Sequence, residues 1–324
     1  MILPAFKFHQ PTSVAEAIDL AQMYNGDFDY VAGGTDVWPN YKNQLNNRKH
    51  VISLARVPEL FEISVGRIGA MARLTDVMKH ADLQRQLPSI PKTVGMIATP
   101  LLRESGTLGG NILLDTRCYY FNQSWFWRNS KGYCLKADGD DCLVVPQKEI
   151  CYATYSGDLA PVLMVLDASF TLAGPEGERT VHSSKFFTHD GITRHVKLPE
   201  EILTRVTIPI ASIALRADYL KLRVRDSMDY PVLGVAVAIA RNERTIEQLR
   251  LGLTGVATTP LLFDEVTQPL AGDQLTEELI ADVANDIMSR VTPYRNVSFS
   301  PQYRKAMISV FIKRLLSQYL PVDD

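Results

Sequence analysis

The chain has 324 residues, of which 46% are hydrophobic and 22% are charged, as in an ordinary soluble globular protein. This length favours about two or three domains over one small core. The formal net charge of -2 gives no basic excess to neutralise phosphates, so we expect no nucleic-acid partner. The most apolar stretches, Pro161–Leu166 and Val232–Ala240, are far shorter than the roughly 20 residues of a membrane helix. Since Met1 to Pro11 shows no secretory signal, we expect a cytoplasmic protein without membrane contact.

Residues 1–55 predict a small α/β unit. Ser13 is placed to cap a helix whose apolar stripe continues to about Tyr24. Short buried strands are expected at Tyr30–Ala32 and at Val51–Leu54. The glycine turn Gly33–Asp36 follows the first strand and leads into a second helix.

Residues 56–213 predict a second unit, in which strands and helices are mixed. The stretch Gly106–Asn111 is rich in glycine and predicts a turn. Strands are expected at Phe61–Val65, Arg67–Ala72, Ser169–Leu172, Arg179–His182 and Ile202–Ile208, and helices at Thr75–Leu83 and Pro161–Leu166. This order of elements is typical of an α+β architecture.

Residues 214–324 predict a C-terminal α+β domain, with an antiparallel sheet first and helices after it. Strands are expected at Tyr219–Val224, Val232–Ala240 and Leu249–Gly255. Amphipathic helices are expected at Glu277–Arg290 and Gln302–Leu320. The fold class of the whole chain is therefore predicted to be α+β.

All the cysteines lie in one irregular segment, residues 114–153. They are Cys118, Cys134, Cys142 and Cys151, separated by 15, 7 and 8 residues. A long structureless loop is uncommon in a compact domain, and the aromatic residues of this one argue against disorder. The spacing matches neither paired zinc motifs nor compact ferredoxin runs. From spacing alone, a [4Fe–4S] cluster and zinc stay nearly equal, and free thiols are less favoured.

Two glycine motifs carry the other candidate chemistry. In the stretch Val31–Asp36, Gly33 and Gly34 follow a strand and let the backbone approach a phosphate or pyrophosphate. In Gly106–Asn111, further glycines are combined with hydrogen-bonding side chains. Either motif taken alone is equally compatible with a tight turn that binds nothing.

Taken together, the motifs resemble those of a known family. The order Gly33–Asp36, Gly106–Asn111 and Ser156–Asp158 is similar to that in the FAD-binding subunits of molybdenum hydroxylases, such as the flavin domains of xanthine dehydrogenase and carbon monoxide dehydrogenase. The resemblance covers nearly the whole chain and includes VAGGTD, GTLGGNI, YSGDLAPVLMVLDA, LTGVATTP and SPQYRKAMISVFIKRLL. It implies a two-part FAD-binding domain, residues 1–55 and 56–213, followed by a C-terminal α+β domain, residues 214–324. One departure is that the family usually has proline at Ser156 or Gly157.

The resemblance also implies which residues bind FAD. The first motif would hold the pyrophosphate, and the second would contact the flavin and its linker. Asp158 would hydrogen-bond to the cofactor, Ile97 would pack near the isoalloxazine ring, and Lys221 aligns with a lysine near the flavin. The implied cofactor residues are Val31, Ala32, Gly33, Gly34, Thr35, Asp36, Ile97, Thr107, Gly110, Asn111, Asp158 and Lys221.

Segment 114–153 lies between Asn111 and Asp158, which are close together in the sequence of most family members. An insertion of this kind resembles that of the β subunits of 4-hydroxybenzoyl-CoA reductases, which carry a [4Fe–4S] cluster. The resemblance implies that Cys118, Cys134, Cys142 and Cys151 all bind such a cluster through their thiolates.

The function implied by this resemblance is electron relay. Electrons from ferredoxin would pass through the cluster and FAD to [2Fe–2S] centres on a small subunit and to molybdenum on a large molybdopterin-binding subunit. There 4-hydroxybenzoyl-CoA would be reduced to benzoyl-CoA, so this chain itself would hold no catalytic residue. The expected assembly is a dimer of heterotrimers. The alternatives are the flavin subunit of an oxidising hydroxylase that donates to NAD or oxygen, and a non-catalytic binding module ordered by zinc.

Overall fold

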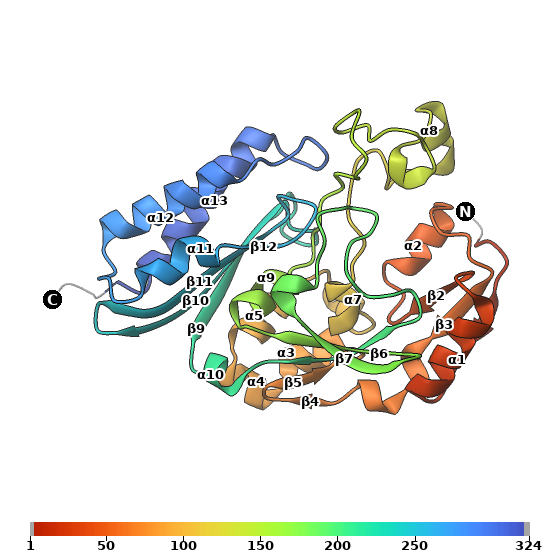
Figure 1. Cartoon of the computed structure of the whole chain (residues 1–324), viewed down its shortest axis with the longest axis horizontal. Helices are drawn as coiled ribbons and strands as arrows, with labels where there is room; N and C mark the ends of the chain where they lie inside the picture. Colours follow the sequence, from red (N-terminus) through yellow and green to blue (C-terminus); the bar gives the residue numbers. More distant parts are fainter. Residues whose placement is uncertain (1–2, 321–324) are drawn as a thin grey trace.

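Residues 3–320 are described by a computed structural model, in which helices pack around three β-sheets (Figure 1). The elements of the first unit are β1 (Lys7–His9), α1 (Val14–Tyr24), β2 (Phe28–Val31), α2 (Val37–Lys42) and β3 (His50–Ser53). Its sheet has the order β1-β3-β2, and both strand pairs are parallel. Helix α1 begins where Ser13 Oγ accepts a hydrogen bond from Glu16 N at 3.1 Å and ends at Asn25, whose φ is 42°. The predicted helix and both predicted strands of this unit are therefore present.

The second unit is built on an antiparallel sheet with the order β4-β5-β8-β6-β7. Its strands are β4 (Ile63–Ser64), β5 (Arg67–Gly69), β6 (Ser169–Gly174), β7 (Gly177–His182) and β8 (Ile202–Thr207). Its helices are α3 (Leu74–Lys79), α4 (Ala81–Gln86), α5 (Ser89–Gly95), α6 (Pro100–Arg103), α7 (Leu108–Ile112) and α9 (Leu159–Val165). Short 3-10 helices are η1 (Leu54–Arg56), η2 (Pro58–Leu60) and η4 (Ser183–Lys185).

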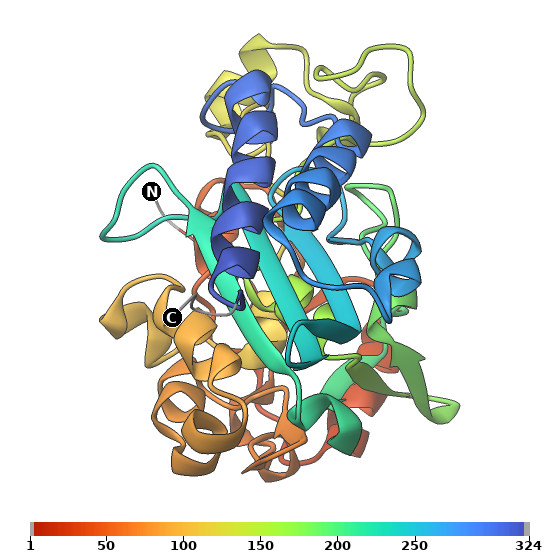
Figure 2. The same cartoon turned by 90° about the vertical axis from the view of Figure 1, so that its left-hand side faces the viewer.

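The third unit has an antiparallel sheet with the order β12-β11-β10-β9. The second unit ends with α10 (Ile210–Ile213), and the elements of the third are β9 (Arg216–Leu222), β10 (Leu233–Asn242), β11 (Thr245–Thr254), β12 (Leu261–Leu262), α11 (Asp264–Thr267), η5 (Gln268–Leu270), α12 (Glu277–Arg290) and α13 (Pro301–Ser317). Helices α12 and α13 lie across one face of this sheet (Figure 2). Between residues 3 and 320, no helix is both long and apolar enough to cross a membrane.

The opposite face of the third sheet shares a core with the second unit. Buried Phe170 and Val206 of the second sheet belong to the same apolar cluster as Leu163 of α9 and as Tyr219 and Ala236 of the third sheet. Helix α9 is therefore buried between the two sheets. The residues just before it are held in place from both sides.

Segment 114–153 rises from the body toward the top of Figure 1. It contains one short α-helix, α8 (Trp125–Ser130), and one 3-10 helix, η3 (Leu135–Ala137). Its base is closed by an antiparallel bridge between Arg117 and Thr154, whose two backbone hydrogen bonds measure 2.7 and 2.8 Å. The predicted irregularity is thus largely confirmed.

Two local predictions in the second unit are wrong. The predicted helix Thr75–Leu83 is broken at His80, whose extended backbone (φ -70°, ψ 115°) separates α3 from α4. The stretch Gly106–Asn111 is the start of helix α7 rather than a turn, because the hydroxyl of Thr107 accepts a hydrogen bond from Gly110 N at 3.1 Å and caps that helix.

Candidate functional site

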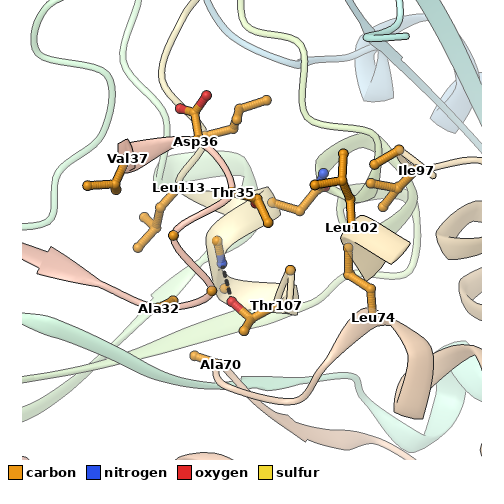
Figure 3. A pocket seen from close by; sticks show the side chains of 18 of the residues that line it. Ala32, Thr35, Asp36, Val37, Ala70, Leu74, Ile97, Leu102, Thr107 and Leu113 are labelled. Atoms are coloured by element: carbon orange, nitrogen blue, oxygen red, sulfur yellow. Dashed lines mark hydrogen bonds between the residues drawn. The ribbon is translucent and has the colours of Figure 1, made fainter. Parts of the chain in front are cut away.

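A cavity of about 530 Å³ lies between the units, which is within the size range of small-molecule and cofactor sites. Its walls include the glycine turn after β2, helix α7 and the loop after β9. Figure 3 shows Thr35 of the glycine turn beside α7, with Ile97 and Leu102 toward the other side of the cavity. The two glycine motifs, about 70 residues apart in sequence, therefore face the same space.

The two motifs pack directly against each other, and the packing requires glycine. A Cβ atom on Gly33 would lie 1.8 Å from the carbonyl oxygen of Ser105. Gly34 has a φ of +70°, which side chains rarely tolerate. A Cβ on Gly109 would lie 2.7 Å from that of Ala70, whose carbonyl accepts a hydrogen bond from Gly109 N at 2.8 Å. The backbone at the cavity wall therefore carries no side chains at these glycines and is held in place by its neighbours. A bound pyrophosphate requires such an accessible backbone.

Side chains of the second motif fix the helices that form the cavity floor. Thr107 caps α7 through its hydroxyl, the bond drawn in Figure 3. Asn111 Oδ1 accepts a hydrogen bond from Leu159 N at 3.0 Å, which joins the end of α7 to the start of α9. Both residues also line the cavity. Each residue therefore stabilises the fold, whether or not it also contacts a ligand.

Asp158 lies on the cavity wall just before α9 and is almost completely buried. Its carboxylate accepts hydrogen bonds from Tyr219 Oη at 2.9 Å and from Lys221 Nζ at 3.1 Å. Burial raises the pKa of Asp158, and the charge of Lys221 offsets part of that rise. Because both partners are on β9, this buried ion pair attaches the third sheet to the cavity.

Ten of the twelve predicted FAD-binding residues line the cavity, and two do not. Those that line it are Ala32, Gly33, Gly34, Thr35, Asp36, Ile97, Thr107, Gly110, Asn111 and Asp158. The side chain of Val31 is buried with Tyr41 and Val51 instead. Lys221 lies behind Asp158 and also donates to the carbonyl oxygen of Met96 at 3.0 Å.

Several lining residues carried no signal in the sequence. They include Tyr30, Lys197, Glu201, Arg225, Asp229 and Tyr230. Glu201, for example, is held at the cavity wall by two hydrogen bonds. Its carboxylate accepts one from Arg179 Nη2 at 2.8 Å and one from Leu198 N at 2.6 Å. Burial lowers the pKa of the neighbouring Lys197 to about 8. Only the packing of distant segments brings these polar and charged groups to the cavity.

The four cysteines meet at a second, smaller cavity inside segment 114–153. All four are buried and none forms a disulfide bond. The cavity is lined by Cys118, Tyr120, Phe121, Cys134, Leu135, Lys136, Cys142, Leu143, Val144, Cys151 and Ala153. Among residues 3–320, no three His, Cys, Asp or Glu side chains are placed to hold one metal ion. The thiols therefore surround a common space without converging on a single point.

The thiols lie in an apolar setting with polar backbone contacts. Burial raises the pKa of Cys118 to about 12 and that of Cys151 to about 11. The backbone amides of Tyr120 and Ala153 approach the sulfurs of these two cysteines at 3.5 and 3.4 Å. Amide hydrogen bonds of this kind stabilise thiolates that bind a metal centre. Binding such a centre would release the thiol protons.

Arg117 links the two cavities. It precedes Cys118 in the chain, and its side chain forms an ion pair with Asp36 of the first glycine motif. Its guanidinium also donates to Tyr230 Oη at 2.6 Å and lies 4.3 Å from the centre of that ring. Asp36 and Tyr230 line the larger cavity, while Cys118 lines the smaller one. No pattern in the sequence singles out Arg117.

Two family models match consecutive parts of the chain. Residues 4–211 match the FAD binding domain in molybdopterin dehydrogenase. Residues 218–319 match the CO dehydrogenase flavoprotein C-terminal domain. Together the matches account for the fold and for the cofactor that the larger cavity is suited to hold.

Individual relatives agree with these matches. The carbon monoxide dehydrogenase medium chain of Hydrogenophaga pseudoflava is 28% identical over 322 residues, which cover 98% of each chain. The aldehyde oxidoreductase FAD-binding subunit of Escherichia coli is 30% identical over 80% of this chain and 83% of its own length. A solved structure of carbon monoxide dehydrogenase from Hydrogenophaga pseudoflava superimposes with a TM-score of 0.80, at 25% identity and with 97% and 96% of the two chains covered. The chain therefore belongs to the FAD-binding subunits of the molybdenum hydroxylase family.

Proposed function

We propose that this chain is the electron-transfer subunit of a molybdenum-dependent 4-hydroxybenzoyl-CoA reductase, with FAD in the larger cavity and a [4Fe–4S] cluster bound by Cys118, Cys134, Cys142 and Cys151. The observation that carries the proposal is the meeting of all four cysteines at one buried cavity, joined to the FAD cavity through Arg117. A flavin subunit that only passes electrons outward needs no second redox site at this position.

The residues of the larger cavity fit FAD. The turn Ala32–Asp36 offers bare backbone for the pyrophosphate, and Gly110 leaves room beside the Thr107 hydroxyl. Ile97 supplies an apolar surface for the isoalloxazine ring. In this proposal Asp158 contacts the cofactor. Lys221 does not contact it but holds Asp158 in position through the buried ion pair.

Four thiolates are the donor set of a cubane cluster and of a zinc site alike, and the two differ in how far apart the sulfur atoms lie. Four thiolates on one tetrahedral zinc ion, with bonds of about 2.3 Å, have sulfur atoms only about 3.8 Å apart. In a cubane cluster each thiolate binds a different iron atom, so the sulfurs surround a wider space. The cysteines here line a common cavity, but no three of them are placed for a single ion.

In this function the chain binds, positions and insulates redox groups. When bound, FAD accepts or donates one or two electrons and the cluster exchanges one at a time. Buried Phe121 and partly buried Leu143 line the cysteine cavity and exclude water from it. We propose ferredoxin as the electron donor and a [2Fe–2S] small subunit and a molybdopterin-binding large subunit as partners. On the large subunit, two electrons and two protons would convert 4-hydroxybenzoyl-CoA to benzoyl-CoA and water.

We propose further that the enzyme is a cytoplasmic dimer of heterotrimers. The four unpaired cysteines fit a reducing compartment. We also propose the division into residues 1–55, 56–213 and 214–324, which is supported by the fact that the strands of each sheet all lie within one of these ranges.

The first test is the composition of the chain purified without oxygen. We expect one FAD and about four iron atoms per chain, with no zinc, as a cubane cluster requires. Flavin with zinc and no iron would leave the family assignment intact and refute the cluster. Flavin with neither metal would also refute it.

The second test separates the cluster from FAD. Cys134→Ser should abolish iron binding and ferredoxin-driven reduction of 4-hydroxybenzoyl-CoA by the assembled enzyme, while FAD content stays at the wild-type level. Ser130→Ala, an exposed change in the same segment, should leave both unchanged. Full turnover by the Cys134 variant at full FAD occupancy would refute electron entry through the cluster.

A second candidate is the flavin subunit of an oxidising molybdenum hydroxylase. The names of the carbon monoxide dehydrogenase and aldehyde oxidoreductase relatives favour it. It predicts that the assembled enzyme reduces NAD or oxygen with electrons from its substrate. It also predicts that loss of the cysteine ligands leaves that reaction unaffected.

A further inference from the structure

Lys136 places a buried positive charge on the wall of the cysteine cavity. Only 8% of its side chain is exposed, and its ammonium group lies 4.6 Å from the centre of the Phe121 ring, which lines the same cavity. Its charge also acts on Cys151, where it opposes the effect of burial on that thiol. A charge in such a dry setting acts far more strongly on its neighbours than it would in water.

The ammonium group is fixed in position by its hydrogen bonds. It donates to Asp115 Oδ1 at 2.6 Å, to Thr116 Oγ1 at 2.6 Å and to the carbonyl oxygen of Gly191 at 3.0 Å. These three acceptors use the donors of the ammonium group. Lys136 therefore cannot move into solvent without losing three hydrogen bonds.

The carboxylate beside Lys136 is shared with a second cation. Asp115 Oδ1 also accepts a hydrogen bond from Arg194 Nη1 at 2.9 Å. Lys136, Arg194 and Asp115 together carry a net charge of about one positive unit, while the carboxylate of Asp190, which accepts a hydrogen bond from Cys151 N at 2.9 Å, adds a negative charge near the cysteines. Asp115 reduces the effect of Lys136 but does not cancel the effect of the whole group.

We propose that Lys136 tunes the reduction potential of the group bound by the four cysteines. The inference rests on the [4Fe–4S] cluster of the proposed function. Each electron that enters makes the cysteine-bound group one unit more negative, and a fixed cation nearby favours that change. Lys136 therefore raises the potential and makes the site easier to reduce, while Asp115 lowers it.

A purely structural role for Lys136 gives a different expectation. Lys136 also ties its loop to residues 115, 116 and 191, so its removal could loosen the cavity. Loosening would act in the same direction whether the lysine or its carboxylate partner were removed. Electrostatic tuning requires the two removals to act in opposite directions.

The test is a redox titration of the full chain, purified without oxygen and carrying FAD and iron, with the reduced cluster followed by its electron paramagnetic resonance signal. Lys136→Met should weaken cluster reduction about tenfold or more, a fall of about 59 mV for one electron. Asp115→Asn should shift the potential upward, and Lys136→Arg should keep most of the wild-type value. Lys148→Met, an exposed change in the same segment, should have no effect.

The outcomes separate this inference from the proposed function. A wild-type chain without iron would refute both. A cluster whose potential is unchanged in the Lys136→Met variant at full iron content would refute the tuning alone, as would shifts of the same sign in the methionine and asparagine variants. If the Lys136→Met variant does not retain iron, the Asp115→Asn variant tests the inference. An upward shift of its reduction potential supports the tuning, and a downward shift refutes it.

Discussion

The FAD cavity and the cysteine cavity lie on either side of Arg117, but they are built in different ways. The FAD cavity is bounded by α7, by Asp158 just before α9 and by strand ends, and Gly33 and Gly109 there contact neighbouring backbone directly. The cysteine cavity is bounded by a segment with one α-helix of six residues. Core packing therefore positions the first site, whereas the second depends on a few polar contacts and, in the proposed function, on the cluster.

Apolar packing shows the same difference. The core around α9 joins two sheets and continues to the FAD cavity. The apolar cluster of the cysteine segment contains Cys118, Phe121, Cys134, Cys151 and Ala153, so the potential metal ligands are themselves much of its core. Regions with few buried apolar contacts open at low free-energy cost. We expect the two sites to respond differently to mutation and to loss of their bound groups.

The largest effect is expected at the ion pair that fixes the FAD cavity. Lys221→Met leaves the carboxylate of Asp158 buried without its cation, which typically costs about 3–5 kcal/mol. Urea unfolding should show this loss, and the double variant with Asp158→Asn should recover much of it because no charge then remains unpaired. Lys185→Met, an exposed change, is the control. Equal stability of the Lys221 and Lys185 variants would contradict this account of the site.

The next effect concerns contact between the two glycine motifs. Gly33→Ala places a methyl group against the carbonyl oxygen of Ser105, and overpacking of this kind costs about 1–3 kcal/mol. Fluorescence titration should show FAD binding weakened roughly 5- to 150-fold, with iron content unchanged. Gly95→Ala, which meets only Met78 Sδ at 3.8 Å, should bind FAD normally. Normal FAD binding by the Gly33 variant would show that this contact does not shape the site.

Removal of iron tests whether the cysteine segment depends on a bound group for its order. With a chelator under reducing conditions, we expect segment 114–153 to be cleaved by trypsin about tenfold faster, because its own apolar contacts are few. Mass spectrometry should locate the new cuts at exposed sites such as Lys131 and Lys148, while FAD stays bound. Unchanged protection without iron would mean that the segment is ordered by its own packing.

The smallest effect is a pH dependence at the FAD cavity wall. Burial alone would raise the pKa of Glu201, but Arg179 and the Leu198 amide hold it below its usual value of 4.5. The stabilisation is therefore fully present above about pH 4.5 and is lost as the pH falls below it. Glu201→Gln should cost about 1 kcal/mol at pH 7, discounted because Arg179 is partly exposed. Thermal unfolding at several pH values should show the difference shrinking toward pH 3, and a constant difference would contradict this assignment.

Local chemistry was sufficient to predict many elements. Ser13 caps α1, the apolar stripe of α12 was placed at Glu277–Arg290, and both glycine motifs reach the cavity. Two predictions were wrong because a backbone angle or a hydrogen bond overrode the sequence pattern. The apolar periodicity predicts one continuous helix, but the extended backbone of His80 breaks it. The glycines predict a turn, but Thr107 caps a helix there.

The sequence by itself determined that the chain has two glycine-rich motifs and one cysteine-bearing segment, because these depend on residue type and order. Only the tertiary structure decided which groups meet. Val31 points into a core while its neighbours line the cavity, and Lys221 lies behind Asp158. Arg117 joins Asp36 across 81 residues, and Lys136 reaches Asp115 beside the cysteines. These pairings follow from the packing of whole sheets and loops, which no local pattern records.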